Sequence, residues 1–215
     1  FPDEARGRSG FPGGYAVVRL DDGRFVFEGA GSTSDIDEPM ADVPADLQVP
    51  PRAVPYLGYQ VTQYWRDLSI PPDAPTAAAL ARQFAAATPE IGPVDGVVFA
   101  DPHALAALVG LLGSIDVPGI GELTQETTVD FVVRDQYLRF PDLGERRDRK
   151  DLLSVIAGEV GLRLQGLSLP SVRSFTETFG PVVADGHLMV TLDPVAEPAA
   201  SALLAETGVD GGFPG

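Results

Sequence analysis

The stretch that decides the predicted fold is residues 94–113, VDGVVFADPHALAALVGLLG. Its first seven residues form a short apolar run, which is typical of a strand buried on both faces of a sheet. Asp101 and Pro102 then place a helix cap and a first-turn proline ahead of the apolar residues 103–113. A strand, a tight turn and a helix therefore follow one another within a single short segment.

The rest of the chain predicts further strands and helices around this unit. Residues 15–27 read as a hairpin about a turn at Gly23, and Thr76 and Thr124 are the expected caps of two helices. We expect helices at 75–87, 125–140, 145–164, 171–178 and 194–206, and strands at 115–117 and 187–192. This mixture predicts an α/β fold, a mixed sheet flanked by helices on both faces in three layers, within a single domain over residues 1–215.

One segment of the predicted domain shows no steady period. Residues 29–55 are rich in proline, glycine and acidic side chains, and we expect a long irregular acidic loop there. Loops of this length inside compact domains are either functional lids or disordered excursions, and the sequence does not decide between them.

The composition excludes several classes of function. The 15 basic and 31 acidic residues give a net charge of −16, so the average surface repels phosphate backbones and nucleic-acid binding is not expected. The chain has no cysteine and only two histidines, which rules out disulfides, thiolate nucleophiles and a three-histidine metal centre. We expect His103 and His187 to be structural. Because the sequence begins with Phe1 rather than methionine, we also expect it to be part of a longer protein.

The basic residues gather in one region. Residues 134–151 contain six of the fifteen, and Arg146 and Arg149 lie three apart at the start of a predicted helix, where both side chains can project from one face. An arginine pair with the free amides of a helix N-terminus can bind a phosphate or pyrophosphate. The alternative is an exposed face on which these arginines pair with Glu145, Asp148 and Asp151.

A second candidate site lies in the acidic loop. Asp35 and Asp37 could hold a hard divalent cation such as Mg²⁺ through their carboxylate oxygens. The alternative is an exposed acidic loop without a ligand. The sequence contains no P-loop, dinucleotide fingerprint or metalloprotease helix motif.

Several motifs resemble an uncharacterised family of actinobacterial envelope proteins, the domain of unknown function four-zero-one-two. They are found at residues 8–18 (RSGFPGGYAVV), 65–67 (WRD), 72–78 (PDAPTAA), 94–98 (VDGVV) and 101–102 (DP). The resemblance covers nearly the whole chain. It implies an extracytoplasmic protein that is anchored in the membrane by a segment upstream of this sequence.

The order of elements is also similar to that of the LytR–CpsA–Psr phosphotransferases, which move glycans from a polyprenyl pyrophosphate carrier onto the cell wall. Residues 94–117 follow the middle of that pattern, and Arg134, Arg146 and Arg149 match its late phosphate-binding arginines. Ser9-Gly10 stands where that family has a metal-binding Ser-Asp, and Ser34-Asp35 stands where it has Pro-Arg-Asp. The likeness therefore implies a divalent ion at Asp35 or Asp37, although this chain lacks one metal ligand and one arginine of the pattern.

Two hypotheses follow for the function. In the first, the chain is a cell-envelope protein that binds a polyprenyl phosphate or similar glycolipid, and its enzymatic version is a glycan phosphotransferase of cell-wall assembly. In the second, it is a non-catalytic binding or scaffolding module for a wall polymer or a protein partner. A deep apolar cavity that ends at arginines would favour the first hypothesis.

Overall fold

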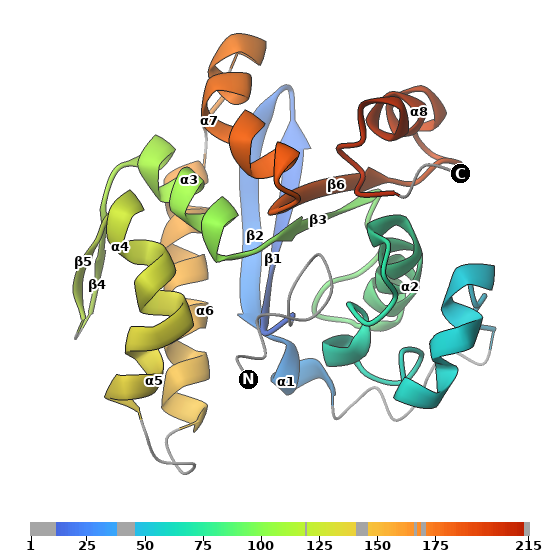
Figure 1. Cartoon of the computed structure of the whole chain (residues 1–215), viewed down its shortest axis with the longest axis horizontal. Helices are drawn as coiled ribbons and strands as arrows, with labels where there is room; N and C mark the ends of the chain where they lie inside the picture. The colour runs from blue at the N-terminus through green and yellow to red at the C-terminus, as the bar shows by residue number, and fades with distance from the viewer. Residues whose placement is uncertain are drawn as a thin grey trace. The chain divides into compact units, whose positions relative to one another are not determined.

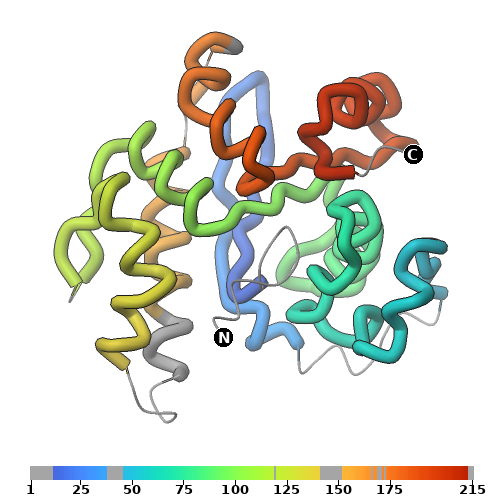
Figure 2. The backbone as a smooth tube through the Cα atoms, in the orientation of Figure 1, coloured from blue at the N-terminus to red at the C-terminus, as the bar shows by residue number. Residues whose placement is uncertain are grey.

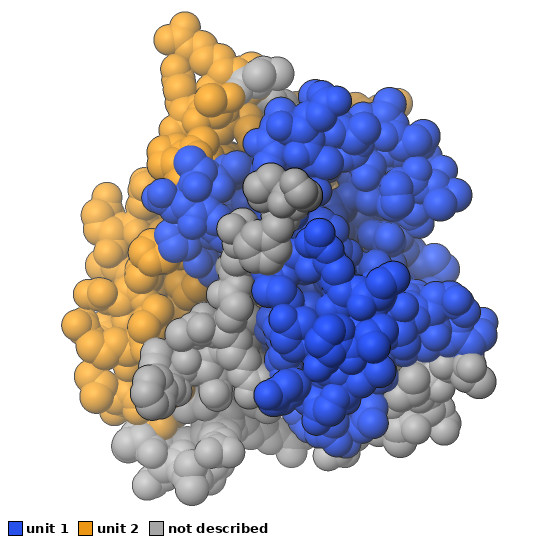
Figure 3. Space-filling view, turned by 45° about the vertical axis from the view of Figure 1, so that its right-hand side comes forward, with its two compact units in different colours: residues 1–12, 33–101, 183–215 blue, residues 13–32, 102–182 orange. Residues whose placement is uncertain are grey.

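The chain divides into two compact units, which Figure 3 shows in blue and orange. The computed structural model describes residues 12–37, 46–118, 120–140, 146–165, 167–168 and 171–212, without the side chains of residues 146–151 and 172. Unit 1 is formed by Phe1–Pro12, Thr33–Asp101 and Val183–Gly215, and unit 2 by Gly13–Ser32 and Pro102–Val182. Each unit therefore combines segments that are distant in the sequence.

Unit 2 begins with the predicted hairpin. Strands β1 (Gly14–Asp21) and β2 (Arg24–Ser32) pair in antiparallel register, with Asp21 opposite Arg24 and an irregularity between Val17 and Val18. The turn residues Asp22 and Gly23 both have positive φ, as a tight two-residue hairpin turn requires. The prediction of a hairpin is thus confirmed, and β2 continues five residues further than expected.

The helices of unit 2 surround a compact apolar core. Its remaining elements are α3 (Pro102–Leu112), β4 (Ile115–Val117), β5 (Gly121–Leu123), α4 (Gln125–Asp130), the π-helical η5 (Phe131–Asp135), α5 (Gln136–Arg139), α6 (Arg146–Leu164) and most of α7 (Val172–Ala184). Residues 125–139 run as one continuous helical rod, drawn in yellow in Figure 2, and Thr124 precedes it as predicted. Val109, Val117, Phe131 and Ile156 bring α3, β4, η5 and α6 into one buried cluster.

Helix α6 packs directly on the hairpin (Figure 1). The sequence places Gly158 and Gly161 inside this helix, and neither interrupts it. A Cβ atom at Gly161 would overlap the ring of Phe27 on β2, whereas a Cβ atom at Gly158 would meet nothing within 4 Å. The absence of a side chain at Gly161 therefore allows the helix and the strand to approach closely.

Unit 1 is built around one alanine-rich helix. Its elements are α1 (Thr33–Asp37), the 3-10 helices η3 (Pro51–Tyr59) and η4 (Trp65–Asp67), α2 (Ala74–Ala87), β3 (Gly96–Ala100), β6 (Leu188–Leu192) and α8 (Pro198–Thr207). Leu80 and Phe84 of α2 are completely buried, and the Phe84 ring meets Trp65 edge-on with 5.6 Å between ring centroids. Small alanine side chains on the same helix let its neighbours pack closely around these large residues.

The cap of α2 differs from the prediction. Asp73, rather than Thr76, is the N-cap residue, and its carboxyl oxygen accepts a hydrogen bond from the Thr76 backbone N–H at 3.0 Å. An aspartate that bonds the N–H three residues later is a favoured helix start, and Pro75 fits the first turn because its missing N–H is not needed there.

The predicted α/β mixture is confirmed, but the single mixed sheet is not found in the described residues. The strands there form three two-stranded antiparallel ladders, β1–β2, β3–β6 and β4–β5. Among the described residues β3 pairs with β6 alone, and Val98 on β3 is 60% exposed, so the expectation of a strand buried on both faces is wrong. Apolar composition alone could not distinguish a central strand from one with a single neighbour.

The predicted loop at 29–55 is shorter than expected. Strand β2 extends to Ser32, α1 follows at once, and η3 begins at Pro51. Residues 38–45 lie outside the described part of the chain. None of the helices described combines the length and the apolarity needed to cross a bilayer.

The two glycines of α6 predict opposite effects on stability. Gly161→Ala places a methyl group against the Phe27 ring and lowers the free energy of unfolding by about 1–3 kcal/mol. Gly158→Ala raises it by up to about 1 kcal/mol because alanine is the better helix former. Urea unfolding of both variants beside the wild type measures the difference, and equal effects of the two substitutions contradict the packing described here.

Candidate functional site

A cluster of buried polar groups joins α1 to η4 in unit 1. The buried carboxyl group of Asp37 accepts a hydrogen bond from the Trp65 backbone N–H at 2.6 Å. Its other oxygen lies 3.5 Å from the Arg66 guanidinium, which also stacks on Tyr64 with 4.0 Å to the ring centroid. Asp67 is 3.8 Å from Arg66, so two carboxyl groups flank one cation. This cluster ties the loop before α2 to the short helix that follows the hairpin.

Burial dominates the electrostatics of Asp37. Desolvation raises the pKa of its carboxyl group above the usual value, against the opposing effects of the Trp65 N–H and of the positive charge on Arg66. A proton is therefore held more tightly by this group in the folded protein than in the unfolded chain. The interaction with Arg66 does not outweigh the loss of water around the carboxyl group.

Three side chains of the same region keep a buried polar atom without a hydrogen-bond partner among the described residues. These atoms are Trp65 Nε1, Ser69 Oγ and Asp73 Oδ2, and they lie within nine residues of sequence. A buried polar atom without a partner is costly, so each of these atoms is a position at which a water molecule or a ligand group would complete the hydrogen bonding.

The predicted metal ligands have different environments. Asp35 is exposed on α1, whereas Asp37 is buried and contacts Trp65 and Arg66. Within the described residues, no group of three or more side chains of the metal-binding types comes together. The two aspartates lie on one short helix, and their role as Mg²⁺ ligands stays a prediction.

The predicted phosphate-binding arginines are described only in part. Arg134 is exposed and forms ion pairs with Asp135 at 2.8 Å and with Asp130 at 3.3 Å. These carboxylates raise the pKa of Arg134, with Asp135 as the larger cause. Arg146 and Arg149 fall in the first turn of α6, but their side chains lie outside the described part of the chain. Their contact with a phosphate stays a prediction.

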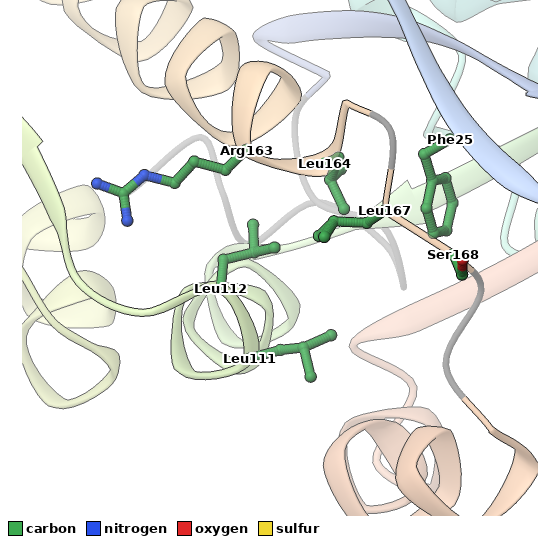
Figure 4. A pocket seen from close by; sticks show the side chains of 7 residues that line it. All are labelled: Phe25, Leu111, Leu112, Arg163, Leu164, Leu167 and Ser168. Atoms are coloured by element: carbon green, nitrogen blue, oxygen red, sulfur yellow. The ribbon is translucent and has the colours of Figure 1, made fainter.

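A different arginine borders a pocket in unit 2. The pocket has a volume of about 490 Å³, and its apolar lining comes from Phe25, Leu111, Leu112, Leu164 and Leu167. Figure 4 shows Leu112, Leu164, Leu167 and Phe25 between Arg163 at one end and Ser168 at the other, with Leu111 set below them and the Arg163 guanidinium directed away from these apolar side chains.

Hydrogen bonds attach the segment that follows α6 to β2 along one side of this pocket. The Phe25 N–H donates to the Leu167 carbonyl at 2.9 Å, and the Phe27 N–H donates to the Gln165 side chain at 2.7 Å. On the other side, Arg163 Nη1 donates to the Ser114 carbonyl at 2.6 Å. Sequence reasoning missed Arg163 because it lies alone near the end of α6, far from the arginine cluster at its start.

The structure gives His187, which is expected from the sequence to be structural, a carboxyl partner. Its Nδ1 lies 2.5 Å from Asp101 Oδ2 in unit 1. The Asp101 backbone N–H also donates to the His187 carbonyl at 3.1 Å. The pair closes the end of the β3–β6 ladder, and its 86-residue separation left no local signal in the sequence.

The comparisons with known proteins identify the family. The family described as "Protein of unknown function (DUF4012)" matches residues 2–137, which is well over half of the chain. The chain belongs to this family, as its motifs indicate. No curated protein and no solved structure matches the chain.

The pKa of Asp37 predicts a pH-dependent stability. Because the pKa of Asp37 is raised, the folded state binds this proton more tightly than the unfolded chain does. The resulting stabilisation is complete below the ordinary pKa of 3.8 and is lost as the pH rises through the pKa of the folded state. Asp37→Asn removes the titration but keeps an oxygen for the Trp65 N–H. We expect the free energy of unfolding of the variant to rise relative to that of the wild type between pH 3 and neutral pH.

Urea unfolding at several pH values measures this difference. Asp35→Asn, an exposed change on the same helix, controls for the loss of one negative charge. A constant difference between Asp37→Asn and the wild type across the range contradicts the burial of an ionisable group at this position.

Proposed function

We propose that the chain binds an amphipathic anion, a polyprenyl phosphate or a similar glycolipid, in the pocket of unit 2. The observation that carries this proposal is an apolar row of side chains with one arginine at its end. A lipid phosphate has two matching parts, an apolar chain for the apolar lining and an oxyanion for the arginine. The volume of about 490 Å³ lies in the range of small-molecule sites.

The apolar row supports binding of the hydrocarbon chain. Leu111 and Leu167 are 40% and 44% exposed, so covering them removes apolar surface from water. Each buried methylene group contributes about 0.8 kcal/mol to such binding. Because Leu167 is held to β2 by a backbone hydrogen bond, this part of the wall is already formed without a ligand.

Arg163 supports binding of the phosphate. One of its five N–H donors is engaged by the Ser114 carbonyl, which fixes the side chain and leaves donors for an oxyanion. The residue lies in the last turn of α6, where the helix dipole favours a cation. A guanidinium group binds phosphate oxygens through charge-assisted hydrogen bonds.

The proposal includes the finer expectations from the sequence. The succession of β3, α3 and β4 supports a likeness to the LytR–CpsA–Psr phosphotransferases, and the family motifs support an extracytoplasmic, membrane-anchored protein of the cell envelope. We restrict the proposed activity to binding, because both oxygens of Asp37 already face protein donors. Glycan transfer would require further groups around the phosphate.

Titration calorimetry with farnesyl phosphate tests the proposal. We expect saturable binding to the wild-type chain, much weaker binding of farnesol and of inorganic phosphate alone, and an affinity about tenfold lower for Arg163→Gln. Arg173→Gln, which removes a charge from an 88% exposed side chain, is the matched control and leaves the affinity unchanged.

The double variant Arg146→Ala, Arg149→Ala identifies which arginines contact the phosphate. A loss of affinity in this variant but not in Arg163→Gln assigns the phosphate to the start of α6 and overturns the site proposed here. Equal binding of farnesyl phosphate to all variants, or no binding to the wild type, favours the scaffolding hypothesis.

A further inference from the structure

Unit 1 contains a second pocket, of about 520 Å³, at the N-terminal end of α2. Pro50 and Pro51 form one wall, Pro75 and Ala79 on α2 form another, and residues of the segment after α8 complete it. This pocket shares no residue with the one proposed for the lipid phosphate.

An aspartate of this pocket has a buried oxygen without a donor. Asp73 is only 3% exposed, and its Oδ1 accepts the N–H that caps α2. Its Oδ2 has no hydrogen-bond partner among the described residues. The cap is satisfied by one oxygen, and the positive end of the helix dipole stabilises a carboxylate there, but the second oxygen still needs a donor.

Three residues that line the pocket cannot donate a backbone hydrogen bond to this oxygen. The prolines at positions 50, 51 and 75 line the pocket and have no backbone N–H. Asp210, on the opposite wall, contributes a second carboxyl group, whose Oδ1 accepts the Gly212 N–H at 2.9 Å. Asp73 and Asp210 thus bring two carboxyl groups to a lining whose side-chain donors are the Arg52 guanidinium and the Thr76 hydroxyl.

One lining residue carries the opposite charge. Arg52 is exposed at the start of η3, and it forms no ion pair with any residue in the described part of the chain. It does not pair with Asp73 or Asp210, although all three line the same pocket. Within the described part of the chain, the pocket thus holds a carboxyl oxygen without a donor and a guanidinium group without an acid.

We propose that this pocket binds a small zwitterion, a molecule with a primary ammonium group and a carboxylate on one short chain. The ammonium group is compact and carries three N–H donors, so it can supply the donor that the buried Asp73 Oδ2 lacks among the described residues, and Asp210 attracts it as well. The carboxylate matches the planar fork of Arg52. The proline rings, which are rigid before binding, hold the connecting methylene groups.

Other ligand classes satisfy only part of this lining. A diamine leaves Arg52 without a counter-charge, and a dicarboxylate leaves Asp73 without a donor and adds repulsion. A diol bonds both groups without charge, and such bonds are roughly half as strong as charge-assisted ones. These differences make the three classes useful competitors in the test.

Calorimetry with amino acids of increasing length provides the test. The probes are glycine, 4-aminobutyrate, 5-aminopentanoate and 6-aminohexanoate, because the chain length sets the distance between the two charged groups. 1,5-Diaminopentane, glutarate and 1,5-pentanediol are the comparison compounds for the five-carbon amino acid. We expect at least one amino acid to bind saturably and more tightly than all three comparison compounds.

Two substitutions assign the binding to this pocket. Asp73→Asn keeps an oxygen for the helix cap but replaces the acceptor Oδ2 with a donor, and Arg52→Gln removes an exposed charge. Each lowers the affinity for the best amino acid by about tenfold or more. Asp185→Asn and Arg173→Gln make the same charge changes at exposed positions outside the pocket and leave the affinity unchanged.

Several results overturn the proposal. They are the absence of binding by every amino acid, equal or tighter binding of the diamine, the dicarboxylate or the diol, and an unchanged affinity in Arg52→Gln. Thermal unfolding checks that Asp73→Asn is folded. If it is not, Asp210→Asn takes its place, because the variant keeps the acceptor for the Gly212 N–H, and an unchanged affinity in that variant also overturns the proposal.

Discussion

The close contact between α6 and β2 determines the geometry of unit 2. Gly161 lets the helix lie against the Phe27 ring, and the chain that leaves the helix then bonds to β2 through Leu167 and Gln165. As a result, the last turn of α6 contributes Arg163 and Leu164 to the pocket that Phe25 also lines. A wider helix–strand spacing would separate the two walls of the apolar pocket.

Local sequence signals predicted most of the secondary structure, because they depend on neighbouring residues. The hairpin of residues 15–27, the helix after Pro102 and the cap at Thr124 all follow from turn and capping chemistry within a few positions. Strand partners depend on contacts between distant segments, such as the pairing of β3 with β6, and one sequence gives no measure of them. The expected mixed sheet therefore differed from the three short ladders.

The candidate sites were less predictable than the fold. Clusters of charge drew attention to Arg146, Arg149, Asp35 and Asp37, whereas the pockets of the structure involve isolated charges such as Arg163. An isolated arginine has no distinctive sequence spacing, so its role can be inferred only from the residues around it in the folded protein. The Asp73 oxygen that lacks a donor among the described residues is likewise recognised only from the three-dimensional structure.

The interleaving of the two units has a consequence for how the chain can be divided. The family match ends at residue 137, before α6 and β6. Helix α6 packs on the hairpin, and β6 is the strand that pairs with β3. A fragment cut at that boundary would retain the shared motifs and lose the elements that cover them. Neither unit is one uninterrupted stretch of sequence, so each unit must form contacts between residues that are distant along the chain. Such contacts slow folding, because long loops must close before the contacts can form. The stability of each unit therefore depends on nearly the whole polypeptide.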